Sequence, residues 1–312
     1  MKNLTLALCI PAYNAASFLP RLLKSAVAQT VPFDEIWVYD DCSSDNTGDI
    51  AKEFGAKVVH GDINRGCSYG KNVLAEKTSC EWLHFHDADD ELYPNFVEQA
   101  RKWMVLENPP DVVLSNYEWR DNDTKKLLNI RNFDDEALAQ DPIAYTIKEQ
   151  INPFCGLYLR ESYLRAGGYD TDPLVLYNED DAFHCRLARA GLKFRSDSTI
   201  TVINYYRSNS MHKANLLKCA RAKYHVLRES AEALGDKYNL EISEKLWGTA
   251  GVSGSYLDWD NADNCVKLAM ELTGRIPVNS SALFKFLCMI NPYLVIRVRE
   301  YCIRFLKPQL RP

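Results

Sequence analysis

The sequence has no Cys-x-x-Cys pair, although it contains ten cysteines among 312 residues. Without that spacing, a zinc ribbon and a thioredoxin-like redox motif are excluded. Free and mostly buried thiols in a reducing compartment are the simplest interpretation. No apolar run is long enough to cross a bilayer, and Leu4–Ile10 is too short for the core of a signal peptide. We therefore expect a cytoplasmic protein.

Positive charge is not in excess either. The net charge is −5 and the isoelectric point is near 5.8, which argues against nucleic acid as the partner. Internal repeats and low-complexity segments are absent, and 46% hydrophobic and 25% charged residues are typical of a globular chain. The charge is uneven, because residues 281–312 carry +5 and leave −10 for the rest.

Strand and helix patterns alternate over the first hundred residues. Apolar runs predict strands at Leu4–Ile10, Glu35–Tyr39, Lys57–His60 and Trp82–His86. Helical spacing predicts helices at 18–27, from a cap at Ser44 or Asp45 to about Phe54, and at Lys71–Lys77. This order predicts an α/β fold with a mostly parallel sheet flanked by helices, in which ligands bind beyond the carboxyl ends of the strands.

The later residues are less regular. We expect a strand at Val112–Ser115, a helix that follows Asn178 and ends at Gly191, and helices from about Asn215 to the end with interruptions at 248–255. The predicted organisation is one catalytic domain at 1–214, with halves at about 1–100 and 101–214, followed by a helical region at 215–312 that ends in a basic amphipathic tail.

Acidic side chains follow two of the predicted strands. If the last strand continues through Asp87 and Asp89, both carboxylates point to one side and suit Mg²⁺ or Mn²⁺ shared with a diphosphate. The alternative is a solvated Asp-rich turn. Asp40 and Asp41 follow the second predicted strand, where a carboxylate can accept the imide N–H of uracil. A cluster that caps the next helix is the alternative there.

Three other side chains near these strand ends have a functional and an ordinary interpretation. Tyr13 could stack on a base, or it could be a simple loop aromatic. Arg65 and Lys71 flank two glycines and could neutralise phosphates, or they could be solvated surface charges.

A third acidic cluster, Glu179–Asp181, begins the helix that ends at Gly191. It could supply a general base that deprotonates an incoming hydroxyl, or it could simply cap the helix. His84 and His86 alternate on their strand and are more typical of a structural pair than of a metal site. His212 could reach a metal bound to the diphosphate.

Taken together, these blocks resemble glycosyltransferase family 2 over about residues 1–212. They occur in the order and at the spacing of that family: Ile10–Asn14, Asp40–Asp45, Asn64–Gly66 with Gly70–Asn72, Asp87–Asp90 with Pro94, and Glu179–Asp180. The resemblance implies a GT-A fold, a nucleotide-sugar donor (a UDP-sugar first of all), a divalent metal (Mn²⁺ or Mg²⁺) and inversion at the anomeric carbon.

The resemblance also implies roles for single residues. Asp180 would be the catalytic base, and Glu179 would orient the acceptor or the base. Asp89 would hold the metal, together with His212. The donor would be bound by uracil contacts from Tyr13 and Asp41, by Asp87 near the ribose, and by Pro11, Arg65, Lys71 and Ala88.

Three positions depart from the family pattern. Cys42 replaces a glycine, which is a modest change if its backbone is not left-handed. Lys71 replaces an arginine and so keeps the charge without the bidentate fork. Asn209 stands where a histidine is expected, and His212 lies three residues further on.

The implied acceptor is a glycan or a lipid-linked glycan, as in bacterial surface polysaccharide synthesis. Residues 281–312 could accordingly lie on the inner face of the cell membrane, or they could pack on the body of the protein. Two other functions remain open. One is a nucleotide-sugar-binding protein without catalysis. The other is a sugar nucleotidyltransferase, although Pro11–Asn14 is not the Gly-rich, basic loop that such enzymes carry.

Overall fold

The computed structural model describes residues 4–207, 215–277 and 281–311, which form two compact units. Unit 1 comprises the described residues within Met1–Tyr145, Ile151–Thr171 and Arg186–Ser208. Unit 2 comprises those within Thr146–Gln150, Asp172–Cys185 and Asn209–Pro312. The division does not follow the predicted boundary at residue 214, because the segment that carries Glu179 and Asp180 clusters with the C-terminal helices.

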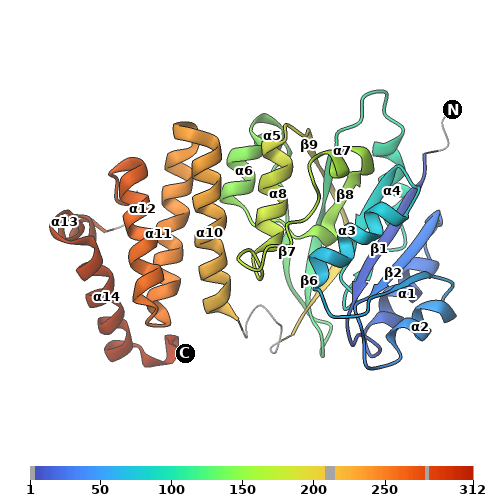
Figure 1. The fold of residues 1–312 in the computed structure, drawn as a ribbon, viewed down its shortest axis with the longest axis horizontal. Helices are drawn as coiled ribbons and strands as arrows, with labels where there is room; N and C mark the ends of the chain where they lie inside the picture. The colour runs from blue at the N-terminus through green and yellow to red at the C-terminus, as the bar shows by residue number, and fades with distance from the viewer. Residues whose placement is uncertain (1–3, 208–214, 278–280, 312) are drawn as a thin grey trace. The chain divides into compact units, whose positions relative to one another are not determined.

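Unit 1 begins with the predicted alternation of strands and helices, coloured blue to cyan in Figure 1. Its parallel strands lie in the order β3-β2-β1-β4. They are β1 (Leu6–Ala12), β2 (Glu35–Asp40), β3 (Lys57–His60) and β4 (Trp82–Phe85). The connecting helices are α1 (Leu19–Val27), α2 (Thr47–Glu53) and α3 (Cys67–Lys77). The parallel sheet predicted for this half is confirmed.

Strand β1 lies at the centre of this half, and all seven of its residues are buried. It begins and ends two residues later than the predicted Leu4–Ile10. Pro11 pairs in register with Tyr39 and therefore lies inside the strand instead of ending it. The carboxyl end of β1, where a ligand would bind, is thus placed at Tyr13.

The other half of the sheet is mixed. It continues in the order β8-β6-β9-β5 with β7 beside β6, and β8 runs antiparallel to both β4 and β6. The strands are β5 (Glu91–Leu92), β6 (Val112–Asp121), β7 (Leu127–Arg131), β8 (Gly156–Leu159) and β9 (Phe194–Tyr206). Short helices connect them: α4 (Phe96–Met104), α5 (Asp135–Gln140), α6 (Pro142–Lys148), the 3₁₀ turn η1 (Pro153–Cys155) and α7 (Arg160–Arg165).

Unit 2 is helical. It contains the start of α8 (Glu179–Arg189), then α10 (Leu216–Leu234), α11 (Asn239–Ser255), α12 (Trp259–Thr273), α13 (Ala282–Ile290) and α14 (Pro292–Leu306), with 3₁₀ turns η2 (Gly235–Tyr238) and η3 (Pro308–Leu310). Helices α10, α11 and α12 pack side by side (Figure 1).

The interruptions predicted at 248–255 are wrong, because α11 continues without a break to Ser255. A Cβ atom on Gly254 would lie 3.3 Å from the ring of Trp259, so this small residue allows the close approach of α12. No helix of the described ranges combines the length and the apolar character that crossing a bilayer requires.

Two fully buried histidines of β4 and its carboxyl end bond to each other. His84 Nδ1 lies 2.8 Å from the carbonyl of Gly156 and must donate, so His84 Nε2 accepts from His86 Nδ1 at 2.9 Å. Burial lowers the pKa of His84 to about 4 and that of His86 well below its ordinary value. The pair is therefore neutral and structural, and it fixes β4 against β8.

This pair should make the free energy of unfolding fall as the pH drops. Between pH 6.5 and 4, His84 is protonated in the unfolded chain but stays neutral in the folded chain. This difference alone lowers the free energy of unfolding by about 3 kcal/mol across that pH range. We expect urea titrations to show this loss in the wild type and a shallower loss in His84→Leu, which shares every other titrating group. Parallel pH dependences in the two proteins would contradict this role.

Candidate functional site

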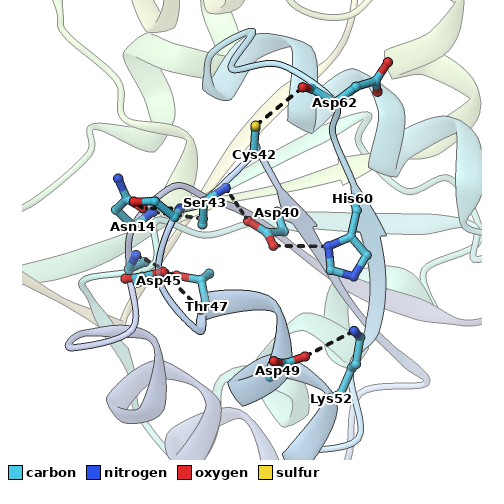
Figure 2. A network of polar contacts seen from close by, with 12 residues as sticks. Asn14, Asp40, Cys42, Ser43, Asp45, Thr47, Asp49, Lys52, His60 and Asp62 are labelled. Carbon is cyan, nitrogen blue, oxygen red and sulfur yellow. Dashed lines mark hydrogen bonds and ion pairs between the residues drawn. The ribbon is translucent and has the colours of Figure 1, made fainter.

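Two loops at the carboxyl ends of β1 and β2 are joined by a polar network (Figure 2). The backbone N–H of Asn14 donates to Ser43 Oγ at 3.0 Å, and Asn14 Oδ1 accepts from the Ser44 N–H at 2.8 Å. Asp45 accepts from the Thr47 hydroxyl and from the N–H groups of Ala16 and Thr47. Burial would raise the pKa of Asp45, but these hydrogen bonds, that of the hydroxyl first, lower it. The loops after β1 and β2 therefore form a single platform.

Two of the predicted donor residues lie close to this platform. Pro11 is buried within β1, whereas Tyr13 directly follows the strand and its side chain is 53% exposed. The ring of Tyr13 is therefore open to contact, and its predicted stacking on a base stays a prediction. The N-cap residue of α2 is Asn46 and not the predicted Ser44 or Asp45, and Asn46 makes no side-chain cap hydrogen bond. Asp45, one residue earlier, accepts from the Thr47 N–H of the first turn.

Asp40 and Asp41 are both buried and take different partners. Asp41 is 3% exposed, and its two oxygens accept the backbone N–H groups of Arg65 and Gly66 at 2.8 and 2.7 Å. Asp40 accepts from the Ser43 N–H at 3.1 Å and lies 3.2 Å from His60 Nδ1 (Figure 2). Asp41 therefore shapes the turn that leads into α3, and its predicted uracil contact stays a prediction.

Cys42 has a φ of 63°, so the backbone at this position is left-handed. We expected the change from glycine to cysteine to be modest only if this backbone were not left-handed, so the change is not a modest one. The ten cysteines are all free, and seven of them, although not Cys42, are buried as expected.

Substitutions of Cys42 should act mainly through the backbone, because the side chain is exposed and its thiol is a weak donor to the Asp62 carbonyl, at 3.5 Å (Figure 2). We expect Cys42→Gly to raise the free energy of unfolding by about 0.5–1 kcal/mol, since the gain in the left-handed conformation exceeds the entropy cost of glycine. Cys42→Val should lower it by at least about 1 kcal/mol. Urea denaturation of the three proteins tests this order, and a valine variant as stable as the glycine variant would contradict it.

Lys71 and Arg65 differ in their surroundings. Lys71 on α3 is 2% exposed, its Nζ lies 4.0 Å from Asp87 Oδ1, and it lies 4.7 Å from the centre of the Tyr169 ring. A solvated surface charge is thus ruled out for Lys71. Arg65 is exposed, and it donates to the Tyr69 hydroxyl at 3.1 Å.

Residues 87–90 form a turn, not an extension of β4, because β4 ends at Phe85 and the Asp90 N–H bonds back to the Asp87 carbonyl at 3.3 Å. The argument from strand alternation is therefore wrong. Asp87 faces Lys71, and the Asp89 carboxylate forms an ion pair with Arg207. The two carboxylates have separate partners in this structure.

Asp90 has a structural role. It is fully buried and accepts from Asn204 Nδ2 and from the Tyr205 N–H, each at 2.8 Å. Burial, followed by the charges of Asp89 and Asp87, raises its pKa well above the ordinary value. Asp90 thus attaches the acidic turn to β9.

The acidic turn fits a divalent cation in its donor chemistry. Asp87 and Asp89 present hard carboxylate oxygens, and their side chains are 40% and 27% exposed. Over the ranges that the structure describes, no three His, Cys, Asp or Glu side chains converge as ligands. A metal held by one or two carboxylates and completed by substrate phosphates and water needs no such group. His212 lies outside the described residues.

The Glu179–Asp181 cluster forms the first turn of α8, within unit 2. Asp181 is 8% exposed and pairs with Lys223 Nζ of α10 at 2.8 Å. The buried His184 contacts the Asp180 backbone carbonyl through Nδ1 at 2.8 Å. Asp181 thus secures the helix start to α10, and Glu179 and Asp180 remain partly exposed beside it.

Two arginines near the acidic turn were not predicted as site residues. Arg207 pairs with the Asp89 carboxylate, and Arg21 of α1 donates to the Asp89 backbone carbonyl. Arg207 is 118 residues from Asp89 in sequence, and Arg21 is 68 residues away. The sequence offers one signal for Arg207, which follows Tyr205 and Tyr206 two residues before Asn209, the position where the family pattern has a histidine. Nothing in the sequence singles out Arg21.

The family model for "Glycosyl transferase family 2" matches residues 7–165. Among curated proteins, the chain is 34% identical over 118 residues to the uncharacterized glycosyltransferase YibD of Escherichia coli, and 29% identical over 117 residues to GlyG of Streptococcus pneumoniae. These matches cover 36% of this chain in both cases, and 34% and 38% of the two relatives. The chain therefore spans only about a third of the length of the curated relatives that it matches.

Solved structures share the fold at low sequence identity. S. aureus TarS 1–349 in complex with UDP-GlcNAc matches 96% of this chain and 92% of its own, with a TM-score of 0.71 and 17% identity. Mannosyltransferase PcManGT from Pyrobaculum calidifontis, in complex with GDP-Man and Mn²⁺, matches 97% of this chain and 87% of its own, with a TM-score of 0.56 and 16% identity. The GT-A fold expected from the sequence is confirmed. The chain belongs to glycosyltransferase family 2.

Proposed function

We propose that this glycosyltransferase moves a hexosyl or N-acetylhexosaminyl group from a UDP-sugar to a hydroxyl of a glycan or lipid-linked glycan. The observation that carries the donor assignment is the acidic turn at the end of β4, where Asp87 lies beside the buried Lys71 and Asp89 beside Arg207. Paired acids and cations of this kind suit a metal-bound diphosphate. The UDP-GlcNAc complex of TarS and the GDP-Man complex of PcManGT support a nucleotide-sugar donor.

In the proposed donor site, Tyr13 stacks on the base, and Pro11 and Ala88 line its pocket with Arg65. Asp41 accepts a hydrogen bond from the uracil imide N–H, using a lone pair that the Arg65 and Gly66 N–H groups leave available. Asp87 accepts a hydrogen bond from a ribose hydroxyl, and Lys71 contributes positive charge toward the phosphates. Asp89 holds the divalent ion, Mn²⁺ or Mg²⁺, together with His212. When bound, this ion stabilises the negative charge on the departing diphosphate.

In the proposed reaction, Asp180 accepts the proton of the acceptor hydroxyl, and Glu179 orients that hydroxyl. The hydroxyl oxygen forms a bond to the anomeric carbon as the bond from that carbon to the diphosphate oxygen breaks, and the electron pair leaves with UDP. Attack from the face opposite the leaving group inverts the anomeric carbon. Asp180 is suited to this role because it is a partly exposed residue in the first turn of α8, where Asp181 is already paired with Lys223.

Calorimetric titration of the protein with UDP, GDP, ADP and CDP in the presence of Mn²⁺ tests the choice of nucleotide. We expect UDP to bind at least tenfold more tightly than the others, and Tyr13→Ala to weaken all four, because stacking does not depend on the base. A preference for GDP would contradict the uracil assignment without affecting the transferase assignment.

We also propose that α13 and α14 contact the membrane on its cytoplasmic face. Each helix leaves an apolar stripe exposed, and the larger side chains are Leu283, Phe286, Ile290, Leu294, Tyr301 and Phe305. Part of the expected basic face is directed into the protein, because Arg297 pairs with Asp263, and Arg304 and Arg311 pair with Glu300. Arg299 and Lys307 are exposed and provide attraction to anionic lipid.

Cosedimentation with vesicles containing anionic lipid tests this contact. We expect the wild type to pellet and Phe286→Glu with Phe305→Glu to stay in the supernatant, whereas Lys267→Glu on the exposed surface of α12 should pellet like the wild type. Equal sedimentation of all three proteins would contradict the proposal. Dimerisation through the same stripe would instead appear as a change in mass by light scattering.

A further inference from the structure

The carboxylate proposed to hold the metal already has a cation from this chain. The Arg207 guanidinium forms an ion pair with Asp89 Oδ2, and both side chains are partly buried, at 28% and 27% exposure. The guanidinium also stacks on the ring of Phe18, 4.4 Å from its centre. Two independent contacts therefore hold Arg207 against Asp89.

A second arginine fixes the backbone of the same turn. Arg21 donates to the Asp89 carbonyl through Nη2 and to Asn122 Oδ1 through Nη1 at 3.2 Å. Its guanidinium carbon lies 3.9 Å from the centre of the Tyr205 ring. Because Arg21 binds the backbone and Arg207 binds the side chain, the Asp89 carboxylate can change its cation without any rearrangement of the turn.

We propose that Arg207 is an internal cation that occupies Asp89 in the donor-free protein and competes with the divalent ion for this carboxylate. The inference rests on the proposed role of Asp89. Mn²⁺ alone therefore binds weakly, since it must displace Arg207 before it reaches the carboxylate oxygen.

Binding of the donor offsets the competition between Arg207 and the divalent ion for Asp89. A diphosphate offers additional oxygens to the divalent ion and at the same time accepts the planar fork of the displaced guanidinium. Arg207 thereby makes the binding of metal and nucleotide mutually dependent, with each ligand increasing the affinity of the other by the same factor. The benefit to the enzyme is that the metal is held firmly only when a nucleotide is present.

Binding of Mn²⁺ without nucleotide tests the proposal directly. Free Mn²⁺ is measured by electron paramagnetic resonance during titration of the full chain. We expect Arg207→Gln to bind Mn²⁺ about three- to tenfold more tightly than the wild type, because an ion pair and a neighbouring positive charge are both removed. The matched control is Arg195→Gln, which breaks an arginine–aspartate pair with Asp135 elsewhere in unit 1 and should bind Mn²⁺ as the wild type does.

Equal or weaker binding of Mn²⁺ to Arg207→Gln overturns the inference. A double variant, Arg207→Gln with Asp89→Asn, separates this result from a failure of the proposed metal site. If Asp89→Asn does not weaken Mn²⁺ binding in the Arg207→Gln background, Asp89 is not the metal ligand and the proposed function loses its cofactor assignment. If Asp89→Asn does weaken it but Arg207→Gln alone has no effect, only the competition is refuted. Thermal unfolding of each variant verifies that it is folded.

Discussion

Replacing Asp180 with asparagine is expected to lower the rate of sugar transfer by about 10²- to 10⁴-fold while nucleotide-sugar binding persists. Asparagine keeps the shape of the side chain but cannot accept the proton of the acceptor hydroxyl. The contact between His184 and the Asp180 backbone carbonyl does not involve the substituted group, so the start of α8 should retain its conformation.

The rate of UDP release and the affinity for the UDP-sugar are measured in the same preparation. Asp260→Asn is the matched control, because Asp260 is an exposed aspartate in the first turn of α12 and should transfer sugar at the wild-type rate. A proportional loss of binding and transfer in Asp180→Asn would contradict the role of a base and would indicate that Asp180 binds the donor.

Replacing Asp89 with asparagine should abolish the effect of Mn²⁺ on UDP binding. The variant keeps the turn in place, because Arg21 binds the Asp89 backbone carbonyl and Asp90 holds the turn to β9. It loses the charged oxygens that a divalent ion requires, so we expect the affinity for UDP with Mn²⁺ to fall at least tenfold, to the value measured in EDTA.

Isothermal titration of UDP with and without Mn²⁺ provides this comparison. Asp49→Asn on α2, whose side chain is 77% exposed, serves as the control and should keep the full metal effect. An undiminished response to Mn²⁺ in Asp89→Asn would mean that the metal is held elsewhere, and the proposed division of roles between Asp87 and Asp89 would have to be abandoned.

The strand–helix alternation of the first hundred residues could be predicted because its signals are local. A buried strand such as β1 reads as a continuous apolar run, and the buried face of α1 reads as a helical repeat through Leu19, Leu22 and Leu23. The mixed half of the sheet could not be predicted in this way. Strand β8 lies between β4 and β6, and this arrangement depends on pairing between residues far apart in sequence.

The candidate site was predictable in its residue types but not in its contacts. The acidic block at 87–90 marks the end of a buried strand, yet only the structure shows that it turns and that Asp87 and Asp89 face different cations. The backbone N–H groups that occupy Asp41 come from a turn 24 residues away. The left-handed backbone of Cys42 could likewise not be predicted from the sequence, because a glycine would indicate such a conformation but a cysteine does not.

The basic tail required structural information for a different reason. Its charge and its apolar content are visible in the sequence, but the direction of each side chain depends on the helices against which it packs. Arg297 forms an ion pair with Asp263 on α12, whereas the side chain of Phe305 is 86% exposed. The tail is consequently less basic at its surface than its composition indicates.

The most direct test of the central claim is release of UDP from a panel of UDP-sugars incubated with the full chain, with Mn²⁺ and with EDTA. The account predicts Mn²⁺-dependent release from at least one UDP-sugar, no release in EDTA, and loss of release in Asp180→Asn but not in Asp260→Asn. UDP-sugars that bind to the wild type with Mn²⁺ but are never cleaved, even with glycan acceptors present, would contradict it and would identify a binding protein instead.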